Sequence, residues 1–594
     1  MKKLFFFILI FTSLSIHSQK EANFWYFGHN AGLDFSTGTP IPTTNGAFQT
    51  AEGSASISNK DGVLLFYTDG STVYNKNHTA MPNGSGLLGN SSSAQSAIIV
   101  PKPLNSNIYY IFTVPNQATN NPNATGSGVN FSEVDITLNG NLGDVTTKNT
   151  ILTNTENAFE KITSVKGEEC NTFWVITSIR DKFYSFKIDK DGVTVNGIAS
   201  THFNNPGGRR GYLKVSPDGK TLVDANANQG TRIYDFNSLT GEITNERQLN
   251  IGAYGVGFSR NSKKLYISTG GHSQLNNPTP GPVQIYQYSL ASSNITDINT
   301  SRNTIYNGSG FRGALQLGPD GKIYYARSWQ TSLGVINFPE KEANEVNFVE
   351  SGLSLNGKIC REGLPPFIQS FFLPIEIKDI DSNEVLNNQT LQYCVGQTRT
   401  IAPDVVTGTG VTYTWKFENT GGTVSTIHND RILTLPNLTT ANTGDYKLTV
   451  NLTDDCGNIT KLEGTFKVGV YEAANATPTN KILFCDAATP DGFNEFDLKA
   501  EKTTLILGGL SATTFEVIYF LNEDDAKNNV TANALVGDKY TNAVAFDTQT
   551  IYARVHNKNA PNTCSDVTSF DVQITGLPVP QTPTDYIICD DTTS

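Results

Sequence analysis

The chain has 594 residues, with 43 Lys or Arg, 55 Asp or Glu and a formal net charge of −12 at pH 7. This acidic balance excludes nucleic acid and anionic lipid as principal partners, because both select a basic face. Only 16% of residues are charged, 38% are hydrophobic and 52 are glycine. The composition predicts a turn-rich, all-β protein that is long enough for several domains.

The first 18 residues predict a secretory signal peptide. Lys2 and Lys3 precede the apolar run 4–11, and Ser18 is the small residue expected to be the last one removed. The run is too short to span a bilayer, and no later stretch approaches about 20 apolar residues. No Cys follows it as a lipid anchor would require. We therefore expect a secreted, extracellular protein without a transmembrane segment.

Repeated hairpins dominate the next part of the chain. Pro-Asp-Gly-Lys occurs in GYLKVSPDGKTLV (211–223) and in GALQLGPDGKIYYA (313–326). Weaker copies occupy 55–70, 186–195 and 256–268. Each copy is a strand, a tight turn and a strand, repeated at roughly 40–60 residues without an intervening helix, which is typical of propeller blades.

Seven strand clusters support this interpretation. They lie at 24–36, 53–75, 97–137, 161–188, 211–237, 254–290 and 312–338. The fold class that we predict is all-β, with a β-propeller of about seven blades over residues 19–374, and six or eight blades as alternatives. The segment 364–374, LPPFIQSFFLP, is expected to be one more strand that helps to close the ring.

Tandem Ig-like β-sandwich modules are predicted after the propeller. Residues 375–470 contain Trp415 in YTWKF and Tyr446 in a Gly-Asp-Tyr corner, both features of immunoglobulin sandwiches. A linker at 471–480 opens a second sandwich that extends to 577. Residues 578–594 are expected to be a linker and the start of a further repeat, because Cys589 in DYIICDDTTS repeats the surroundings of Cys485 in KILFCDAATPDG.

Seven cysteines in an exported chain predict disulfides. Grouping them by domain favours the pairs Cys394–Cys456, Cys485–Cys564 and Cys170–Cys360 but leaves the connectivity open. Cys589 is left over. Its partner is expected in sequence beyond residue 594, and a free thiol or an intermolecular bridge is the alternative.

Motifs for catalysis are weak, and no catalytic residue is assigned. No Gly-x-Ser-x-Gly, His-Glu-x-x-His, Walker loop or Cys-x-x-Cys occurs. The acidic residues are dispersed, and His29, His78, His202 and His272 lie singly in expected loops. No cofactor is expected, except that Asp486, Asp491 and Asp497 are candidate Ca²⁺ ligands in the second sandwich, with ordinary turns as the alternative.

Four residues are candidates for ligand binding. Trp329 follows a predicted strand among polar residues and could stack on a sugar ring. Arg209, Arg210 and Arg312 precede expected inner strands, where a propeller channel is bordered. A glycan or carboxylate ligand is the functional hypothesis, and a structural role in packing the blades is the alternative.

Several segments resemble a known group of proteins. They are WYFGHNAGLDFSTG, EGSASISNKDGVLLFYTDGSTVYNKNH, MPNGSGLLGNSSSAQSAIIVPKP, GALQLGPDGKIY and GLPPFIQSFF. They resemble the N-terminal propeller of large exported Bacteroidetes proteins, which continue through Ig-like modules to a gliding-motility-associated, type B sorting domain read by the type IX secretion system. The resemblance covers residues 23–374 closely and 375–594 loosely, and it implies surface adhesion. The sorting domain itself does not occur in this sequence.

Together these observations predict a secreted cell-surface binding protein, an adhesin with a propeller as recognition head and sandwiches as stalk. Its expected partners are an extracellular glycan or a surface protein, and the secretion machinery through a further C-terminal domain. The alternatives are an extracellular polysaccharide-acting enzyme with its site in the propeller channel, and a protein–protein scaffold in a surface complex.

Overall fold

The computed structural model describes residues 20–576, except 117–127, 157, 180–181, 202–209, 228–229, 271–280, 374, 388, 407, 454–455, 458 and 487–490. The expected signal peptide, Arg209 and Cys589 lie outside the described residues. The chain forms two compact units. The first contains residues 1–376, 405–413 and 449–464, and the second contains 377–404, 414–448 and 465–594.

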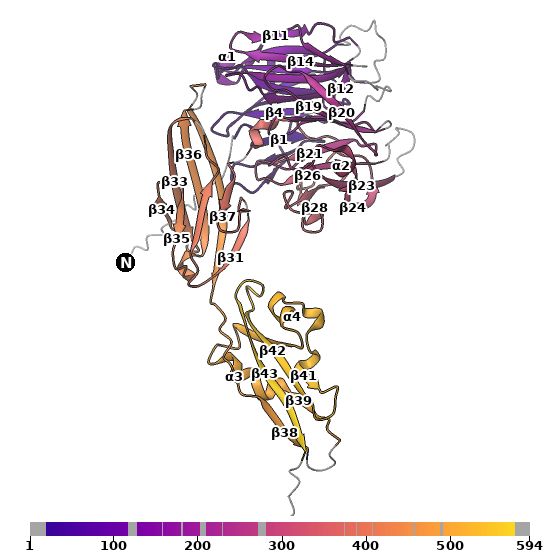
Figure 1. Ribbon diagram of the computed structural model, residues 1–594. Helices are drawn as coiled ribbons and strands as arrows, with labels where there is room; N and C mark the ends of the chain where they lie inside the picture. The colour runs from indigo at the N-terminus through magenta and orange to yellow at the C-terminus, as the bar shows by residue number, and fades with distance from the viewer. Residues whose placement is uncertain are drawn as a thin grey trace, which may run out of the picture. The chain divides into compact units, whose positions relative to one another are not determined.

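The described residues between 24 and 354 form seven antiparallel sheets in chain order (Figure 1, indigo to magenta). The first three sheets are β1 (Phe24–Phe27), β2 (Ala31–Asp34) and β3 (Ile41–Thr43); β4 (Ala55–Ser58), β5 (Leu64–Thr68), β6 (Thr72–Asn75) and β7 (Ala80–Ser85); and β8 (Ala97–Pro101), β9 (Ile108–Thr113), β10 (Asn130–Asp135) and β11 (Asp144–Ile151).

The other four sheets continue this pattern. They are β12 (Ala158–Lys166), β13 (Phe173–Ile179), β14 (Lys182–Asp189), β15 (Gly192–Val193) and β16 (Ile198–Thr201); β17 (Leu213–Val215), β18 (Thr221–Asp224), β19 (Thr231–Phe236) and β20 (Ile243–Leu249); β21 (Gly255–Phe258), β22 (Lys264–Ser268), β23 (Gly281–Ser289) and β24 (Asn303–Gly310); and β25 (Leu315–Leu317), β26 (Ile323–Tyr325), β27 (Ser332–Ile336) and β28 (Phe348–Ser354). Two short helices, α1 (Leu138–Asn141) and α2 (Ile295–Thr300), lie in the connections.

Local turn chemistry produces the hairpins, and those predicted from the sequence are confirmed. β17–β18 and β25–β26 pair antiparallel on either side of the two Pro-Asp-Gly-Lys turns. Gly219 and Gly321 have φ of 74° and 80°, in the left-handed region that glycine enters without a steric penalty. The backbone N–H of Ser216 donates to Thr221 across the first turn at 2.7 Å.

The predicted strand clusters each stop before the last strand of their sheet. The first strands, such as β4, β17 and β21, are buried at every position. The last strands are polar and largely exposed, as in β28 (FVESGLS). A strand at a sheet edge that faces water on both sides does not need to alternate apolar and polar residues. The hydrophobic pattern by which inner strands are recognised is therefore missing from these outer strands.

The prediction of a strand at 364–374 is wrong. Residues 364–368 have no regular structure, and Gln369–Phe372 form a short 3₁₀ helix. Pro365 and Pro366 have no N–H to donate to a strand ladder. The segment is nevertheless buried in the first unit: Tyr212 Oη contacts both the N–H and the carbonyl of Leu364, and the backbone N–H of Lys166 donates to Ser370 Oγ at 3.0 Å.

Residues 377–576 contain four more sheets in the described part of the chain. Two of them are β29 (Ile377–Asp379), β30 (Glu384–Val385), β32 (Arg399–Pro403) and β35 (Leu433–Leu435); and β31 (Thr390–Cys394), β33 (Thr409–Asn419), β34 (Val424–His428), β36 (Gly444–Thr453) and β37 (Ile459–Tyr471). The other two are β38 (Ile482–Asp486), β40 (Phe515–Phe520), β42 (Thr548–Asn557) and β43 (Ser565–Gly576); and β39 (Glu495–Asp497) with β41 (Lys539–Thr541). Helices α3 (Thr504–Leu507) and α4 (Glu523–Asn528) accompany the last pair.

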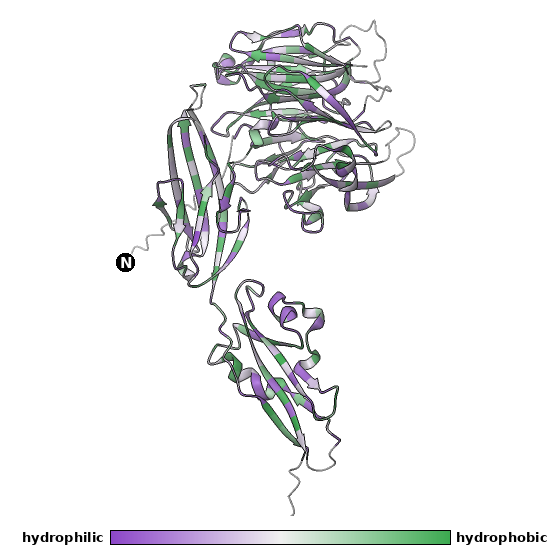
Figure 2. Ribbon diagram, viewed as in Figure 1, coloured by the Kyte–Doolittle hydropathy of each residue, from purple (hydrophilic) through white to green (hydrophobic). Residues whose placement is uncertain are grey.

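Two of these sheets share one strand arrangement. The early strand β31 pairs in parallel with β37, and β38 pairs in parallel with β43. Hydrophobic and hydrophilic residues alternate along the strands (Figure 2), so one face of each sheet packs into a core. Trp415 is fully buried, and the Tyr446 hydroxyl donates to the carbonyl of Asn442 at 3.0 Å, as the predicted corner requires.

Candidate ligand-binding surface and disulfide junctions

Arg312 is buried and is neutralised by two acidic side chains. Its Nε donates to Glu362 at 2.6 Å and its Nη2 donates to Glu52 at 2.9 Å, and all three residues are buried. The guanidinium also lies 4.8 Å from the ring centroid of Tyr254. These contacts use the charge of Arg312 within the protein and correspond to the packing alternative rather than to an open ligand site.

Glu52 belongs to a larger group of carboxylates. Burial raises its pKa well above the usual range, and the nearby carboxylates of Glu160 and Glu362 raise it further. Arg210 lies at the edge of this group, with its Nε 3.9 Å from Glu160 and its side chain 41% exposed. The structure therefore brings two sequence-predicted arginines, Arg210 and Arg312, to one buried acidic group. Arg209 lies outside the described residues.

Trp329 is the most exposed of the ligand-binding candidates that the structure describes, and it has an uncommon backbone conformation. It lies in the turn between β26 and β27, is 49% exposed and has φ of 65°. A bulky side chain rarely adopts this left-handed conformation. The conformation is fixed by two backbone hydrogen bonds: the N–H of Trp329 donates to the carbonyl of Cys360 at 2.8 Å, and that of Cys360 donates to Gln330 at 2.7 Å.

Arg361 and His29 complete a cluster around Trp329. The Arg361 guanidinium lies 3.8 Å from the centroid of the indole, and the His29 ring meets the indole edge-on at 5.6 Å. Arg361 Nη1 donates to His29 Nε2 at 3.1 Å. Because arginine can only donate, His29 Nε2 must be the acceptor and the imidazole is neutral. Burial lowers the pKa of His29, and the charge of Arg361 lowers it further.

A small cleft lies next to the turn that carries Trp329, although Trp329 itself does not line it. Ser328 and Gln330, which flank Trp329 in the chain, line it together with Tyr306, Phe311, Tyr325, Arg327, Val283, Ser309 and Gly310. Its volume is about 40 Å³, room for a few water molecules. Arg327 within it is paired with Glu350 at 2.6 Å, and the Tyr306 hydroxyl donates to the same carboxylate at 2.8 Å.

The sequence pointed to Trp329 but missed Arg361 and did not single out His29. Arg361 follows β28 in the chain, and His29 lies between β1 and β2. They meet because the N–H of His29 donates to the carbonyl of Ile359 at 2.9 Å. No local pattern reports a contact between residues 29 and 359, so only the tertiary structure could reveal it.

The candidate calcium ligands cap turns. Asp486 accepts the N–H of Gly492, Asp491 accepts that of Phe493 and Asp497 accepts that of Ala500. Among the described residues, no three His, Cys, Asp or Glu side chains are close enough together to hold a metal ion. The calcium site stays a prediction.

The predicted cysteine pairs are wrong. The structure joins Cys170 to Cys456 and Cys394 to Cys564, with Cα–Cα distances of 5.1 and 5.5 Å. Cys360 is a buried free thiol and Cys485 an exposed one. The bonded pairs thus cross the predicted domain boundaries instead of closing each domain on itself.

Strand direction explains the correction. β31 lies parallel to β37, so Cys394 is opposite Tyr471, whereas Cys456 precedes the other end of β37. At about 3.3 Å per residue, the ends of β37 are roughly 40 Å apart. A disulfide needs Cα atoms within about 7 Å. In the same way Cys485 is opposite Thr575, at the far end of β43 from Cys564.

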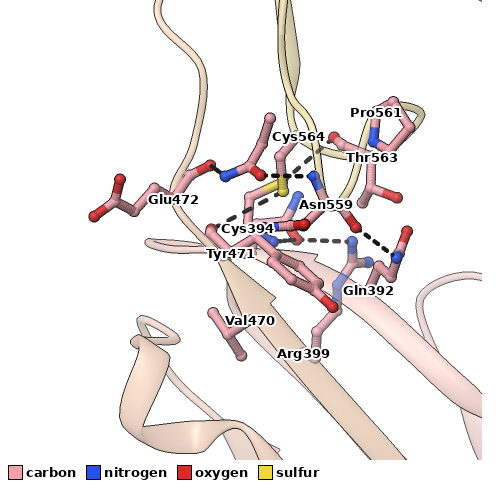
Figure 3. Close-up of a disulfide and its surroundings, with 12 residues drawn as sticks. Gln392, Cys394, Arg399, Val470, Tyr471, Glu472, Asn559, Pro561, Thr563 and Cys564 are labelled. Carbon is pink, nitrogen blue, oxygen red and sulfur yellow. Dashed lines mark hydrogen bonds between the residues drawn. A yellow bond between two sulfur atoms is a disulfide. The ribbon is translucent and has the colours of Figure 1, made fainter. Parts of the chain in front are cut away.

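The Cys394–Cys564 junction is a compact covalent link (Figure 3). Cys394 ends β31, and Cys564 lies in the turn between β42 and β43. Both are buried with Ala560, and Tyr471 packs against them. Gln392 Nε2 donates to the carbonyl of Asn559 at 2.9 Å beside the bond. Side chains and backbone of both joined modules therefore shield the disulfide from solvent.

One protein family matches the C-terminal part of the chain. Residues 481–578 match FIDD, the Flavobacterium inter-domain disulphide bond domain. Cys564 lies within the matched residues and Cys394 lies outside them, so the observed bond agrees with the name of the family. No curated protein matches this chain. The family match points to a surface protein of the Bacteroidetes type.

Solved structures share only low similarity with the chain. The extracellular domain of BT4673 from B. thetaiotaomicron is 11% identical, with a TM-score of 0.32, over 76% of this chain and 56% of that one. This chain thus spans just over half the length of that neighbour. A protein provisionally assigned as TolB from Agrobacterium tumefaciens is 12% identical, with a TM-score of 0.28, over 51% of this chain and 96% of that one. TM-scores this low support no functional argument.

The disulfides and the family match are those of an extracellular protein, because such bonds persist in oxidising compartments. Within the described residues, no helix is long and apolar enough to cross a membrane. What the findings establish is an extracellular-type chain of disulfide-bonded, all-β modules.

Proposed function

We propose that the chain is a secreted cell-surface adhesin. In this proposal the seven sheets are the blades of a β-propeller head over residues 19–374, and Ig-like sandwiches at 375–470 and 471–577 form a stalk. Seven consecutive meanders with buried first strands support the propeller. The buried Trp415 and the Tyr446 corner support the Ig-like assignment.

The observation that carries the proposal is the Cys394–Cys564 bond between the two predicted sandwiches. An adhesin must transmit tension from its ligand to its point of attachment. Contacts between small domains yield under such a load, whereas a disulfide holds until it is reduced. A covalent link at a module junction is of direct use to a protein under tension and of little use to a freely diffusing enzyme.

The test has two parts and uses the mature chain with its disulfides intact. Equilibrium binding to an array of neutral and acidic polysaccharides and surface proteins should show saturable binding to at least one class. A Cys394→Ser/Cys564→Ser variant should keep that affinity but detach sooner when beads carrying it are pulled from the ligand under flow. An absence of saturable binding by folded protein would overturn the adhesin, and equal detachment of the two proteins would overturn the load-bearing stalk.

The rival function, a polysaccharide-acting enzyme, has one observation in its favour. Glu52, Glu160 and Glu362 lie close together, and the raised pKa of Glu52 is the property that a general acid needs. However, all three side chains are buried, and two of them, Glu52 and Glu362, form ion pairs with Arg312. Release of new reducing ends from a bound polysaccharide, abolished by Glu52→Gln, would establish the enzyme instead.

Export by the type IX system and attachment to the cell surface belong to the same proposal, on the strength of the family resemblance. A C-terminal sorting domain would supply both. Detection of the protein on intact cells, and its loss when that secretion system is disabled, would test this part separately.

A further inference from the structure

We infer that Trp329, Arg361 and His29 form a binding site for an acidic sugar, a pyranose ring that carries a carboxylate. This inference rests on the proposed function, because it names the class of ligand that the head recognises. It differs from the site predicted from the sequence in one central respect: the cation is Arg361, on the surface, and not the buried Arg312.

The indole face that the Arg361 guanidinium does not cover supplies a surface on which a sugar ring can stack, with its carboxylate at the rim beside Arg361. Trp329 is 49% exposed although its neighbours Ala326 and Ser328 are buried. Exposed tryptophan of this kind stacks on the C–H face of a sugar, and polar groups at its edge bind the hydroxyls. Gln330 and Ser328, the chain neighbours of Trp329, supply polar groups and line a cleft of about 40 Å³, which is too small for a ring.

Arg361 supplies a positive charge that only the more distant carboxylates of Glu362 and Glu52 offset. Among the described residues no carboxylate lies within ion-pairing distance of it, in contrast to Arg312, Arg327 and Arg247, which each have one. Its Nη1 donates to neutral His29, and its Nε is buried without an acceptor in the described part of the chain. A carboxylate is the ligand group that guanidinium binds best.

His29 is a positioning residue. Its hydrogen bond to Nη1 and the indole beneath the guanidinium hold Arg361 in one orientation from two sides. The backbone of residues 359–360 holds two members of the cluster. The carbonyl of Ile359 accepts a hydrogen bond from the N–H of His29, and the carbonyl of Cys360 accepts one from the N–H of Trp329. The three side chains are thereby fixed in place before any ligand arrives.

The conformation of Trp329 agrees with a ligand site, although the exposed residues Leu104 and Phe546 also have a positive φ. Its φ of 65° is unfavourable for a bulky residue, and asparagine or glycine occupies most of the other left-handed positions of the chain. Strain of this kind is typical of ligand sites.

An acidic sugar fits better than an acidic peptide. A peptide would need an extended groove or a free strand edge, and the cleft beside Trp329 measures only about 40 Å³. A single ring with one carboxylate matches one indole and one guanidinium. Binding to acidic peptides in preference to sugars is thus an outcome that would contradict the inference.

The first experiment needs no mutation. The mature chain is titrated with polygalacturonate and with alginate, two uronate polymers of different stereochemistry, and with the methyl ester of polygalacturonate, which keeps the ring but loses the charge. We expect at least tenfold tighter binding to the acids than to the ester, and weaker binding as salt is added. Equal affinity for acid and ester would overturn the inference even if the adhesin proposal stands.

Variants then assign the roles. Arg361→Gln should lower the affinity for the acids at least tenfold and leave weak ester binding unchanged, whereas Trp329→Ala should weaken binding to both. The matched control is Arg302→Ala, because Arg302 also lies over an aromatic ring, that of Tyr286 at 5.4 Å, outside this cluster. Thermal melts of each variant check folding.

The outcomes separate the two proposals. If the wild type binds only neutral glycans or proteins on the array, the acidic-sugar site is wrong and the adhesin stands. If it binds nothing, both fail. An effect of Arg302→Ala equal to that of Arg361→Gln would show non-specific charge attraction and would also overturn the site.

Discussion

Arg312 and Arg361 lie near the same carboxylates, since Arg312 pairs with Glu362, the residue next to Arg361 in the chain, but among the described residues only Arg312 forms ion pairs with them. Each guanidinium lies over an aromatic ring, that of Tyr254 at 4.8 Å for Arg312 and that of Trp329 at 3.8 Å for Arg361. Arg312 is buried and binds Glu52 and Glu362. Arg361 is half-buried and, in the described structure, has only a neutral imidazole as hydrogen-bond partner.

The difference shows that carboxylate partners, not residue type or sequence context, decide what an arginine does here. A desolvated guanidinium must be paired to be tolerated, and the pairing leaves nothing for a ligand. A half-buried guanidinium can remain unpaired because water still reaches it. Arg312 is thus a structural cation in the interior, and in our proposal Arg361 is the cation that a ligand reaches.

Removing the buried arginine is the strongest test of its structural role. Arg312→Met should lower the free energy of unfolding of the first unit by about 3–5 kcal/mol, because two buried carboxylates then lose their ion pair with the guanidinium. Adding Glu52→Gln should restore part of the loss. Urea denaturation followed by circular dichroism measures both, and a loss below about 1 kcal/mol would contradict the structural role.

Lys214 tests the same rule with a cation that is buried but has no carboxylate partner in the described residues. Its Nζ donates to the carbonyl of Leu315 at 2.7 Å and to Gln316 Oε1 at 3.0 Å, and burial lowers its pKa to about 7.

The unfolded chain keeps the usual lysine pKa, so between pH 7 and about 10 it binds a proton that the folded chain does not. The free energy of unfolding should therefore rise with pH across this window, by up to about 1.4 kcal/mol per unit from this group, with the penalty complete below pH 7. Lys214→Met should flatten the rise by about 2 kcal/mol between pH 7.5 and 9. Denaturation at the two pH values measures it, and an unchanged slope would refute the assignment.

The positive φ of Trp329 gives a test at the other site, because its energetic cost can be measured by substitution. Trp329→Gly should be more stable than Trp329→Ala by about 1 kcal/mol, because glycine adopts a φ of 65° without the steric cost that a Cβ carries. Both variants remove the indole, so the difference isolates the backbone term. Thermal melts suffice, and a less stable glycine variant would mean that the conformation is relaxed.

The smallest effect is expected at Arg361. Arg361→Gln should change the free energy of unfolding by about 1 kcal/mol or less, since no ion pair is lost and only the indole contact and the hydrogen bond to His29 are affected. The same denaturation assay compares it directly with Arg312→Met. A loss as large as that of Arg312 would erase the distinction between the two sites.

Local features of the fold were predictable from the sequence. The Pro-Asp-Gly-Lys hairpins form because proline, aspartate and glycine favour the turn wherever it occurs, and the buried first strands are visible as apolar runs. The outermost strands escaped prediction because polar, exposed edges have no hydrophobic pattern. The segment at 364–374 was misjudged because its apolar residues report burial, which an irregular chain shares with a strand.

The cysteines show where sequence reasoning fails. Proximity along the chain predicted pairs inside each domain, but a strand about 40 Å long can separate two cysteines of one sandwich. Cys394 therefore bonds to Cys564, at a separation of 170 residues. Only the parallel pairing of β31 with β37, which the sequence does not encode locally, makes this evident.

The sequence by itself determined the composition class and the hairpin turns, and it pointed to Trp329, because each depends on residues near one another in the chain. The tertiary structure decided the disulfide partners, the burial of Arg312 and the meeting of Arg361 with His29. These depend on which strands lie side by side and on which charges find partners across hundreds of residues. Long-range pairing is a property of the whole packed chain, and no short segment of it carries that information.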